Sequence, residues 1–139
     1  MAESTFMLEV VTPERIVLSD EVEFMVVPAV EGELGVLRNH APMVAGLKIG
    51  VLRYRGTDGI TRHMAVSGGF MEVIDNEAIV LAETAERGSE IDILRAKAAK
   101  ERAERRLQQR TEEINFVRAQ MALQRALARI KAAEADQRL

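Results

Sequence analysis

The positions of the residues that interrupt helices constrain this chain more than any other feature. All 9 glycines and all 3 prolines lie before residue 89, and residues 89–139 consist mainly of Ala, Leu, Arg, Glu, Lys and Gln. These residue types favour helices, whereas Gly and Pro break them. Residues 89–139 are therefore predicted to be helical, and the preceding residues must fold in another way. We expect two domains, residues 1–87 and residues 88–139.

The first part of the chain has the pattern of an all-β domain. Residues 5–83 contain short runs of β-branched and aliphatic residues that are separated by turn residues. One run covers residues 22–27 and is expected to stop at Pro28. Hairpins are expected at residues 56–59 (Gly-Thr-Asp-Gly) and 75–76 (Asp-Asn), because these residues favour tight turns. The pattern is typical of an antiparallel sandwich or barrel in which consecutive strands pair.

Local signals place the start of the helical part. Ser89 is followed three residues later by Asp92, a pattern that resembles a capping box and predicts a helix start at Ser89. The helical part covers about 50 residues, which is much longer than a usual globular helix. We therefore expect the chain to fold back once and to form a two-helix hairpin.

The best position for the break between the two helices is residues 109–113. Arg110 would lie in the last turn of the first helix, and Thr111 would cap the second, with Glu112 and Glu113 placed favourably at its positive end. No Gly or Pro enforces this break. Such a connection suits a segment that is a hairpin in one state and extended in another.

The two parts of the chain carry opposite charges. Residues 1–90 contain 7 Lys and Arg against 15 Asp and Glu, whereas residues 91–139 contain 12 against 7, so their net charges are −8 and +5. Such asymmetry favours two modules with different partners. The basic part suits an anion or an acidic protein surface.

Composition argues against several classes of protein. The chain has 2 histidines and no cysteine, and it lacks a phosphate-binding loop and a Gly-x-Ser-x-Gly elbow. His40 and His63 lack the spacing of a metal site, so we interpret both as structural or surface residues. An aromatic content of 4% argues against nucleic-acid binding by base stacking. The residues define no metal site and favour a non-enzymatic role.

The sequence contains no 18-residue apolar run and no basic start followed by an apolar stretch. We therefore expect a protein that is not exported and does not insert into the membrane.

Helical periodicity gathers arginines and alanines on one face of each predicted helix. At about 100° per residue, the members of each set fall within a narrow arc. In a hairpin the two faces could surround a polyanion with guanidinium groups, and the alanines would leave room for a flat base. Asp92 could accept a hydrogen bond from an amino or hydroxyl group, or orient Arg95. The two sets are Asp92, Arg95, Ala99 and Arg102, and Arg118, Ala122, Arg125 and Arg129.

Two other interpretations fit the same faces. The arginines could form a solvated surface opposite an apolar stripe that packs on the first helix or on the sandwich. They could instead meet an acidic protein partner. The stripe consists of Phe116, Leu123, Leu127 and Ile130.

Several short strings follow one another along nearly the whole chain. They are residues 11–14 (Val-Thr-Pro-Glu), 32–37 (Gly-Glu-Leu-Gly-Val-Leu), 40–42 (His-Ala-Pro) and 65–73 (Ala-Val-Ser-Gly-Gly-Phe-Met-Glu-Val), followed by the alanine-rich tail. Together they resemble the epsilon subunit family of F-type ATP synthase. The resemblance implies a flattened antiparallel β-sandwich followed by a mobile two-helix hairpin. It implies a non-catalytic rotor subunit that couples the catalytic head to the proton-driven membrane ring.

The resemblance also implies partners. The sandwich would bind the gamma subunit and the membrane c-ring, and the extended helices would contact the alpha and beta subunits. In similar proteins the loop that corresponds to residues 31–42 faces the ring, so Glu31, Glu33 and His40 are candidate contacts. The protein would be a peripheral membrane protein on the cytoplasmic face of a bacterial cell membrane.

The family's nucleotide motif, Ile/Leu-Asp-x-x-Arg-Ala, is present at residues 91–96. The resemblance implies ATP as a regulatory ligand that is bound and not hydrolysed. With ATP the hairpin would fold on the sandwich, and without ATP it would extend and inhibit hydrolysis. The alternative is a structural rotor adaptor with a static hairpin and no nucleotide binding. The implied ATP-binding residues are Ile91, Asp92, Arg95, Ala96, Arg102, Arg118, Arg125 and Arg129.

Overall fold

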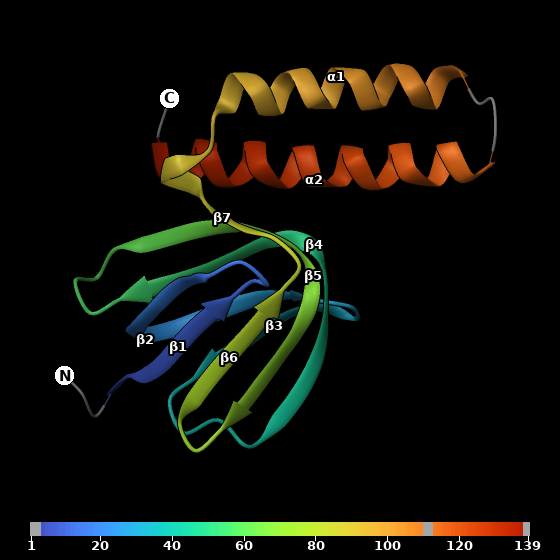
Figure 1. Ribbon diagram of the computed structural model, residues 1–139. Helices are drawn as coiled ribbons and strands as arrows, with labels where there is room; N and C mark the ends of the chain where they lie inside the picture. The colour runs from blue at the N-terminus through green and yellow to red at the C-terminus, as the bar shows by residue number, and fades with distance from the viewer. Residues whose placement is uncertain (1–3, 110–112, 138–139) are drawn as a thin grey trace.

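The computed structural model describes residues 4–109 and 113–137 and consists of a β-sandwich with a helical hairpin lying across one end (Figure 1). No helix within these residues is long and apolar enough to span a membrane. The elements in chain order are β1 (Phe6–Val11), β2 (Ile16–Ala29), β3 (Gly32–Leu37), β4 (Met43–Gly56), β5 (Thr61–Ile74), β6 (Glu77–Ala82), β7 (Ala85–Arg87), the 3-10 turn η2 (Gly88–Glu90), α1 (Ile93–Gln109) and α2 (Glu113–Gln137).

The strands form one sheet that closes on itself. Its order is β1-β6-β5-β4-β2-β3, β7 pairs with β5, and β1 also pairs with β2. The result is the predicted sandwich followed by the predicted hairpin. Two details differ from the prediction: β1 and β6 run parallel, and β3 pairs with β2 but not with β4. Strands that no tight turn connects are free to pair in these other ways.

Both predicted hairpin turns are present. Asp75 and Asn76 have φ angles of 51° and 60° and join β5 to β6. Positive φ at both central residues is the geometry that matches the right-handed twist of paired strands. The Gly-Thr-Asp-Gly segment at residues 56–59 joins β4 to β5.

Pro28 does not stop β2, contrary to the sequence prediction. It lies inside the strand, opposite Glu33 of β3, where the pairing of β2 with β4 shifts register between Val26 and Ala29. Proline is tolerated at such irregularities because the ladder there does not require its missing N–H. Gly50 of β4 makes room for the ring, since a Cβ at that position would lie 2.7 Å from the Cβ of Pro28.

The main core lies between the two layers of the sandwich. Alternate residues of β1, of β6 and of the end of β5 point inward, in keeping with the period of two of a strand. Its largest fully buried side chains are Leu8, Met25, Leu52, Met64, Met71, Val10, Val22, Val27, Val36, Val66 and Val80.

The first helix begins later than the capping pattern predicts. Ser89 lies within η2, and the N-cap of α1 is Asp92, whose Oδ1 accepts a hydrogen bond from the Arg95 N–H at 3.1 Å. Asp92 therefore satisfies one of the open N–H groups of the first helical turn. The predicted break is confirmed, because α1 ends at Gln109 and α2 begins at Glu113. The caps expected from Arg110, Thr111 and Glu112 lie outside the described residues, as does the side chain of Glu113.

A second, smaller core joins the hairpin to the sandwich. It contains Ile91 and Ala65, with Ala96 of α1 and three alanines of α2, and Ile130 packs against it. The predicted stripe is only partly correct, because Leu127 is 44% exposed and Phe116, Leu123 and Ile130 are half-buried. Small side chains allow α2 to approach both α1 and the sheet closely. The buried residues of α2 are Ala119, Ala126, Ala128, Ala132 and Ala133.

Candidate functional site

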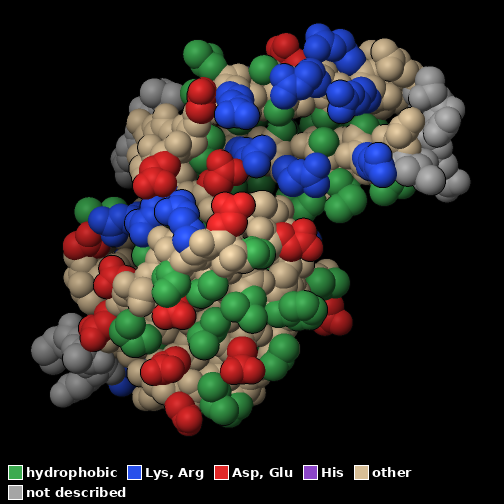
Figure 2. All heavy atoms as spheres, in the orientation of Figure 1, with side chains coloured by type: hydrophobic (Ala, Val, Ile, Leu, Met, Phe, Trp, Pro, Cys, Tyr) green, Lys and Arg blue, Asp and Glu red, His purple; other side chains and the backbone are tan. Residues whose placement is uncertain are grey.

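The hairpin presents a cationic face that continues down to the sandwich. Figure 2 shows Lys and Arg side chains along both helices, and acidic side chains where the hairpin meets the sandwich and across the sandwich itself. Two cavities open along this face. We call them the inner pocket, next to the sandwich, and the outer pocket, toward the end of the hairpin where α1 ends and α2 begins.

The inner pocket lies where η2 and the start of α1 meet α2. Its volume is about 540 Å³, which is within the range of small-molecule sites. Three arginines and three carboxylates line it, so its charges are mixed. Its lining consists of Glu86, Glu90, Ile91, Asp92, Arg95, Ala96, Ala99, Arg102 and Arg129.

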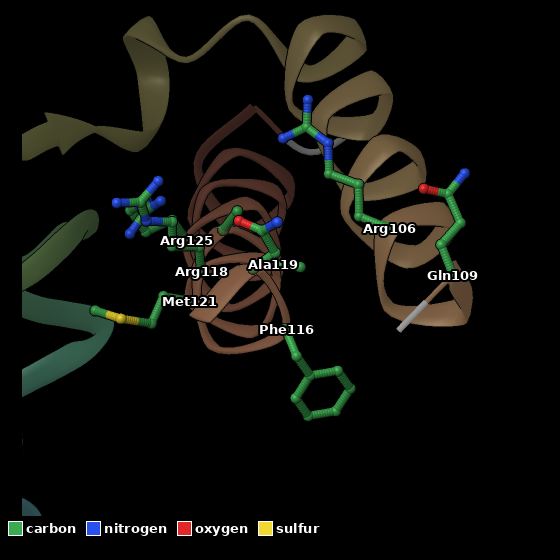
Figure 3. Close-up of a pocket in the computed structure, with 9 residues that line it drawn as sticks. Arg106, Gln109, Phe116, Arg118, Ala119, Met121 and Arg125 are labelled. Carbon is green, nitrogen blue, oxygen red and sulfur yellow. The ribbon is translucent and has the colours of Figure 1, made fainter. Parts of the chain in front are cut away.

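The outer pocket has a volume of about 510 Å³ and a different charge. Figure 3 shows Arg106 reaching from α1 toward α2, while Arg118 and Arg125 project together from one side of α2. Gln109 and Asn115 add amide groups, and the described lining residues include no Asp or Glu. The described lining of this pocket is therefore positively charged, with three arginines.

The predicted ATP-binding residues divide between the two pockets. Ile91, Asp92, Arg95, Ala96, Arg102 and Arg129 line the inner pocket, and Arg118 and Arg125 line the outer one. A narrow cleft bordered by Arg125, Arg129 and Glu86 lies between them. The eight residues thus lie along one continuous face and do not converge on a single point.

The inner pocket holds two residues of the nucleotide motif in defined roles. One carboxylate oxygen of Asp92 accepts the hydrogen bond that caps α1. Because Asp92 is exposed, its second oxygen is available to a ligand. Asp92 orients the backbone of Arg95 through the capping bond, and no bond joins it to the Arg95 guanidinium. Ile91 and Ala96 are 6% and 3% exposed, so they form the apolar floor beneath the charged groups.

Arg129 is already paired. Its Nε donates to Oε1 of Glu86 at 2.6 Å, across the junction of α2 and β7. A phosphate at the inner pocket would have to compete with this carboxylate. Among the described residues, Arg95, Arg102, Arg118 and Arg125 have no ion-pair partner.

Sequence reasoning missed the carboxylates of the inner pocket. Glu86 precedes the helical part and meets Arg129 only through folding, across 43 residues of chain. Glu90 lies in η2, which no local pattern predicted. Their closeness to Asp92 in the sequence was the signal that could have placed them at this site. Arg106, Gln109 and Asn115 were also missed. Helical periodicity could have found Arg106, which falls within the arginine and alanine arc of the first helix, whereas Gln109 and Asn115 lie just outside the two arcs.

The candidate partner contacts lie apart from the pockets and from one another. Residues 31–42 are not a single loop, because they contain β3, which places Glu31 and His40 beyond opposite ends of that strand. Six strand residues span roughly 20 Å. Glu33 is exposed and its Oε2 lies 3.4 Å from Nη1 of Arg53. His40 is half-buried, and its Nδ1 lies 2.7 Å from the Ala41 carbonyl oxygen.

The sandwich also carries exposed apolar side chains on the outer face of β4, β5 and β6 (Figure 2). Phe70 and Leu81 are register partners, and they are 62% and 55% exposed. Val44 and Ile74 lie on the same strands and are 68% and 46% exposed. Exposed apolar side chains gathered on one face, here around Glu72, are typical of an interaction site.

No group of three or more His, Cys, Asp or Glu side chains within the described ranges could hold a metal ion. His63 is not a ligand in such a group, and instead contacts Asp136.

The fold and the site define a two-domain protein in which an arginine-lined helical hairpin docks on a β-sandwich. Two family models match this arrangement: the beta-sandwich domain of the ATP synthase delta/epsilon chain over residues 5–88, and its long alpha-helix domain over residues 89–134. The chain belongs to the epsilon-chain family of F-type ATP synthase.

Relatives are similar over nearly their full length. The ATP synthase epsilon chain of Syntrophomonas wolfei is 72% identical over 134 residues, which cover 96% of this chain and 98% of the relative. That of Pelotomaculum thermopropionicum is 59% identical over 133 residues, with the same coverage of 96% and 98%.

Solved structures share the fold. A chain in the Euglena gracilis mitochondrial ATP synthase, in a structure of OSCP, F1 and the c-ring, superposes with a TM-score of 0.81 at 25% identity and covers 96% of this chain and 82% of its own. A chain of the Tetrahymena thermophila mitochondrial enzyme has a TM-score of 0.53 at 14% identity, with 94% coverage of both chains, and supports the fold alone.

Proposed function

We propose that this protein is a non-catalytic subunit of the ATP synthase rotor, which couples the catalytic head to the membrane ring. The observation that carries the proposal is the match to epsilon chains along both domains. The Euglena complex that contains a similar chain also contains F1 and the c-ring. The protein would accordingly be peripheral to a bacterial membrane, on its cytoplasmic face.

The sandwich would provide the binding surfaces of the rotor subunit. The apolar face that includes Phe70 and Leu81 suits a permanent neighbour, for which we propose the gamma subunit. Glu31, Glu33 and His40 remain the proposed contacts to the c-ring. Because β3 separates Glu31 from His40, a ring that touches both must extend along this strand.

The hairpin would provide regulation, with ATP as a ligand that is bound and not hydrolysed. In the closed state described above, the arginines of both helices form one cationic face beside an apolar floor. The carboxylate oxygen of Asp92 that does not cap α1 is suited to accept from a base or a sugar hydroxyl. Arg95, Arg102 and Arg125 form no ion pair with another residue of the described ranges, and their guanidinium groups are suited to the phosphates.

Closure and opening of the hairpin would link ATP to activity. A ligand that binds only the closed hairpin shifts the chain toward that state. Without it, the helices would extend toward the alpha and beta subunits and obstruct rotation in the direction of hydrolysis. The small alanine-rich contact between hairpin and sandwich supports this proposal, because separating it exposes far less apolar surface than opening the main core.

The direct test is calorimetric titration of ATP into the full chain, with ADP as a comparison. We expect saturable one-site binding that Arg95→Ala weakens at least about tenfold, as loss of a charged hydrogen bond does. Arg105→Ala is the matched control, since Arg105 is exposed on the same helix and lines neither described pocket. Asp92→Asn is preferable to Asp92→Ala, because asparagine still caps a helix.

The alternative is a rotor adaptor whose hairpin never opens, and the Arg129–Glu86 ion pair favours it, because the pair neutralises one arginine and ties α2 to β7. In that case ATP produces no binding heat, and all of these variants behave alike.

A further inference from the structure

The last turn of α2 holds the hairpin to the edge of the sandwich. Both carboxylate oxygens of Asp136 lie 3.1 Å from the backbone nitrogen of His63, and Oδ1 lies 2.9 Å from the His63 Nδ1. The Asp136 side chain is only 9% exposed. It is therefore a nearly buried carboxylate whose hydrogen bonds are all made to the other domain.

The position of His63 explains why the sheet needs this partner. On this side of β5, β7 pairs only with Met64, Ala65 and Val66. His63 lies one residue beyond the end of β7, so no strand covers its N–H there. A buried backbone N–H without a partner is costly, and Asp136 supplies the acceptor that a longer β7 would have provided.

The neighbouring residue extends the contact to the nucleotide motif. Gln137 Nε2 donates to the carbonyl oxygens of Gly88 and Ile91, at 2.9 and 2.8 Å. Gly88 is the residue at which η2 begins, and Ile91 and Asp92 line the inner pocket. The end of α2 thus fixes the segment from which the floor and the capping carboxylate of that pocket project.

Neither Asp136 nor Gln137 is among the described residues that line the pockets. Their action on a ligand would therefore be indirect. The apolar contact that they supplement is small, so these polar bonds add to what favours docking. Its buried side chains are five alanines and Ile91, and Ile49, Val51, Ile93 and Ile130 pack against them.

We propose that Asp136 and Gln137 form a latch, and that this latch sets the closed fraction of the hairpin before any ligand binds. They are positioning residues that set the affinity of the inner pocket through this equilibrium. The closing role is independent of the proposed function, whereas the effect on affinity rests on it. When only the closed state binds, the observed Kd equals the intrinsic Kd divided by the closed fraction.

The test compares Asp136→Asn and Gln137→Ala with the unaltered full chain. Glu134→Gln is the matched control, because Glu134 lies in the same part of α2 but is exposed. Because the chain has no cysteine, Thr57→Cys and Lys131→Cys introduce two unique exposed dye positions, one on the sandwich and one on α2. Energy transfer between the dyes gives the closed fraction without nucleotide, and calorimetry with ATP gives Kd.

We expect both latch variants to lower the closed fraction and to raise Kd by the same factor, up to about tenfold. The product of the two quantities should then equal that of the unaltered chain, and Glu134→Gln should change neither. A closed fraction that stays unchanged in both variants overturns the latch. A Kd that rises without a change in closed fraction overturns the indirect mechanism. If the unaltered chain binds no ATP, the proposed regulation by ATP fails, and the energy-transfer comparison still decides the latch.

Discussion

At the scale of single residues, the ion pair between Arg129 and Glu86 controls how much positive charge a ligand meets in the inner pocket. The two side chains are 34% and 42% exposed, so the pair itself contributes little stability, roughly 0–1 kcal/mol. The pair has a more direct effect on phosphate binding. Arg129 must break its bond to Glu86 before its guanidinium group can donate freely to a phosphate.

Replacing Glu86 with glutamine should therefore tighten ATP binding by about two- to fivefold, since it releases Arg129 and removes a negative charge. Calorimetric titration at low and high salt measures this change. Glu90→Gln is the comparison, because Glu90 lines the same pocket without a described ion pair. This variant measures the effect of removing a negative charge without releasing an arginine. Weaker binding in Glu86→Gln would mean that Glu86 contacts the ligand, which the account does not predict.

A second residue-scale prediction concerns the β4–β5 turn. The hydrogen bond from Arg62 and the N–H of Ile60 lower the pKa of Asp58 from its ordinary 3.8 to about 2. Because the pKa is lower in the folded state, Asp58 stabilises the fold above pH 4, and this contribution disappears as the pH falls from about 4 to 2. Carbon-detected NMR titration should give a midpoint near 2 in the native chain and a higher one in Arg62→Gln, which stays below the ordinary 3.8 because the Ile60 N–H bond remains. An unshifted midpoint in the native chain would exclude the contact.

The sequence predicted single residues well where their roles are local. The capping pattern found the right segment but the wrong residue, because Ser89 lies in η2 and Asp92 caps α1. Glu86 and Asp136 were not found, because each acts on a residue 43 or 73 positions away. No periodicity carries that information. Their partners are defined only once the hairpin lies on the sandwich.

At the scale of elements, η2 and α2 approach so closely that only glycine fits between them. A Cβ on Gly88 would lie 2.4 Å from the Ala132 carbonyl oxygen and 2.7 Å from Oδ2 of Asp136. The contact involves backbone, so no side-chain rotation relieves it. The position depends on this close approach and not on a positive φ.

Gly88→Ala should therefore separate the hairpin from the sandwich and destabilise the docked state by about 1–3 kcal/mol, as overpacking does. Hydrogen exchange should accelerate at the amide of His63 and remain slow in the core strands. Gly35→Ala is the matched control, because a Cβ there meets nothing within 4 Å and the residue is exposed in β3. Equal protection of His63 in both variants would contradict this interpretation of the contact.

Element types were predictable because propensity and period agree along each part of the chain. The helix break was found from capping residues, and two hairpins were found from their turn residues. The position of Pro28 inside a strand and the existence of β7 were not predicted, for a common reason. A register shift accommodates Pro28, and β7 exists because its three residues find an open edge on β5, so both depend on pairing between distant segments.

At the scale of the whole molecule, docking of a +5 hairpin on a −8 sandwich brings the arginines of α2 near the carboxylates of η2 and β7. The charge asymmetry was visible in the sequence, but the orientation of the hairpin was not. It depends on the latch at the end of α2 and on buried alanines. Of these, Ala119, Ala126 and Ala133 recur every seven residues, a spacing that indicates a buried face but not the surface on which it packs. The division of the predicted site into two pockets follows from that orientation.

The central claim is that the hairpin regulates by leaving the sandwich. Ala65 of β5 and Ala128 of α2 line the same narrow cleft, so Ala65→Cys with Ala128→Cys allows an oxidative cross-link that holds the hairpin closed. The chain has no other cysteine. Each single-cysteine variant, oxidised in the same way, controls for the substitutions.

The most direct measurement is ATP hydrolysis by the assembled complex, compared with and without this cross-link over a range of ATP concentrations. The account predicts that the reduced complex is inhibited at low ATP and recovers as ATP rises, whereas the cross-linked complex is active throughout. Identical rates in the two forms at every ATP concentration would contradict the account and leave a rotor subunit with a static hairpin.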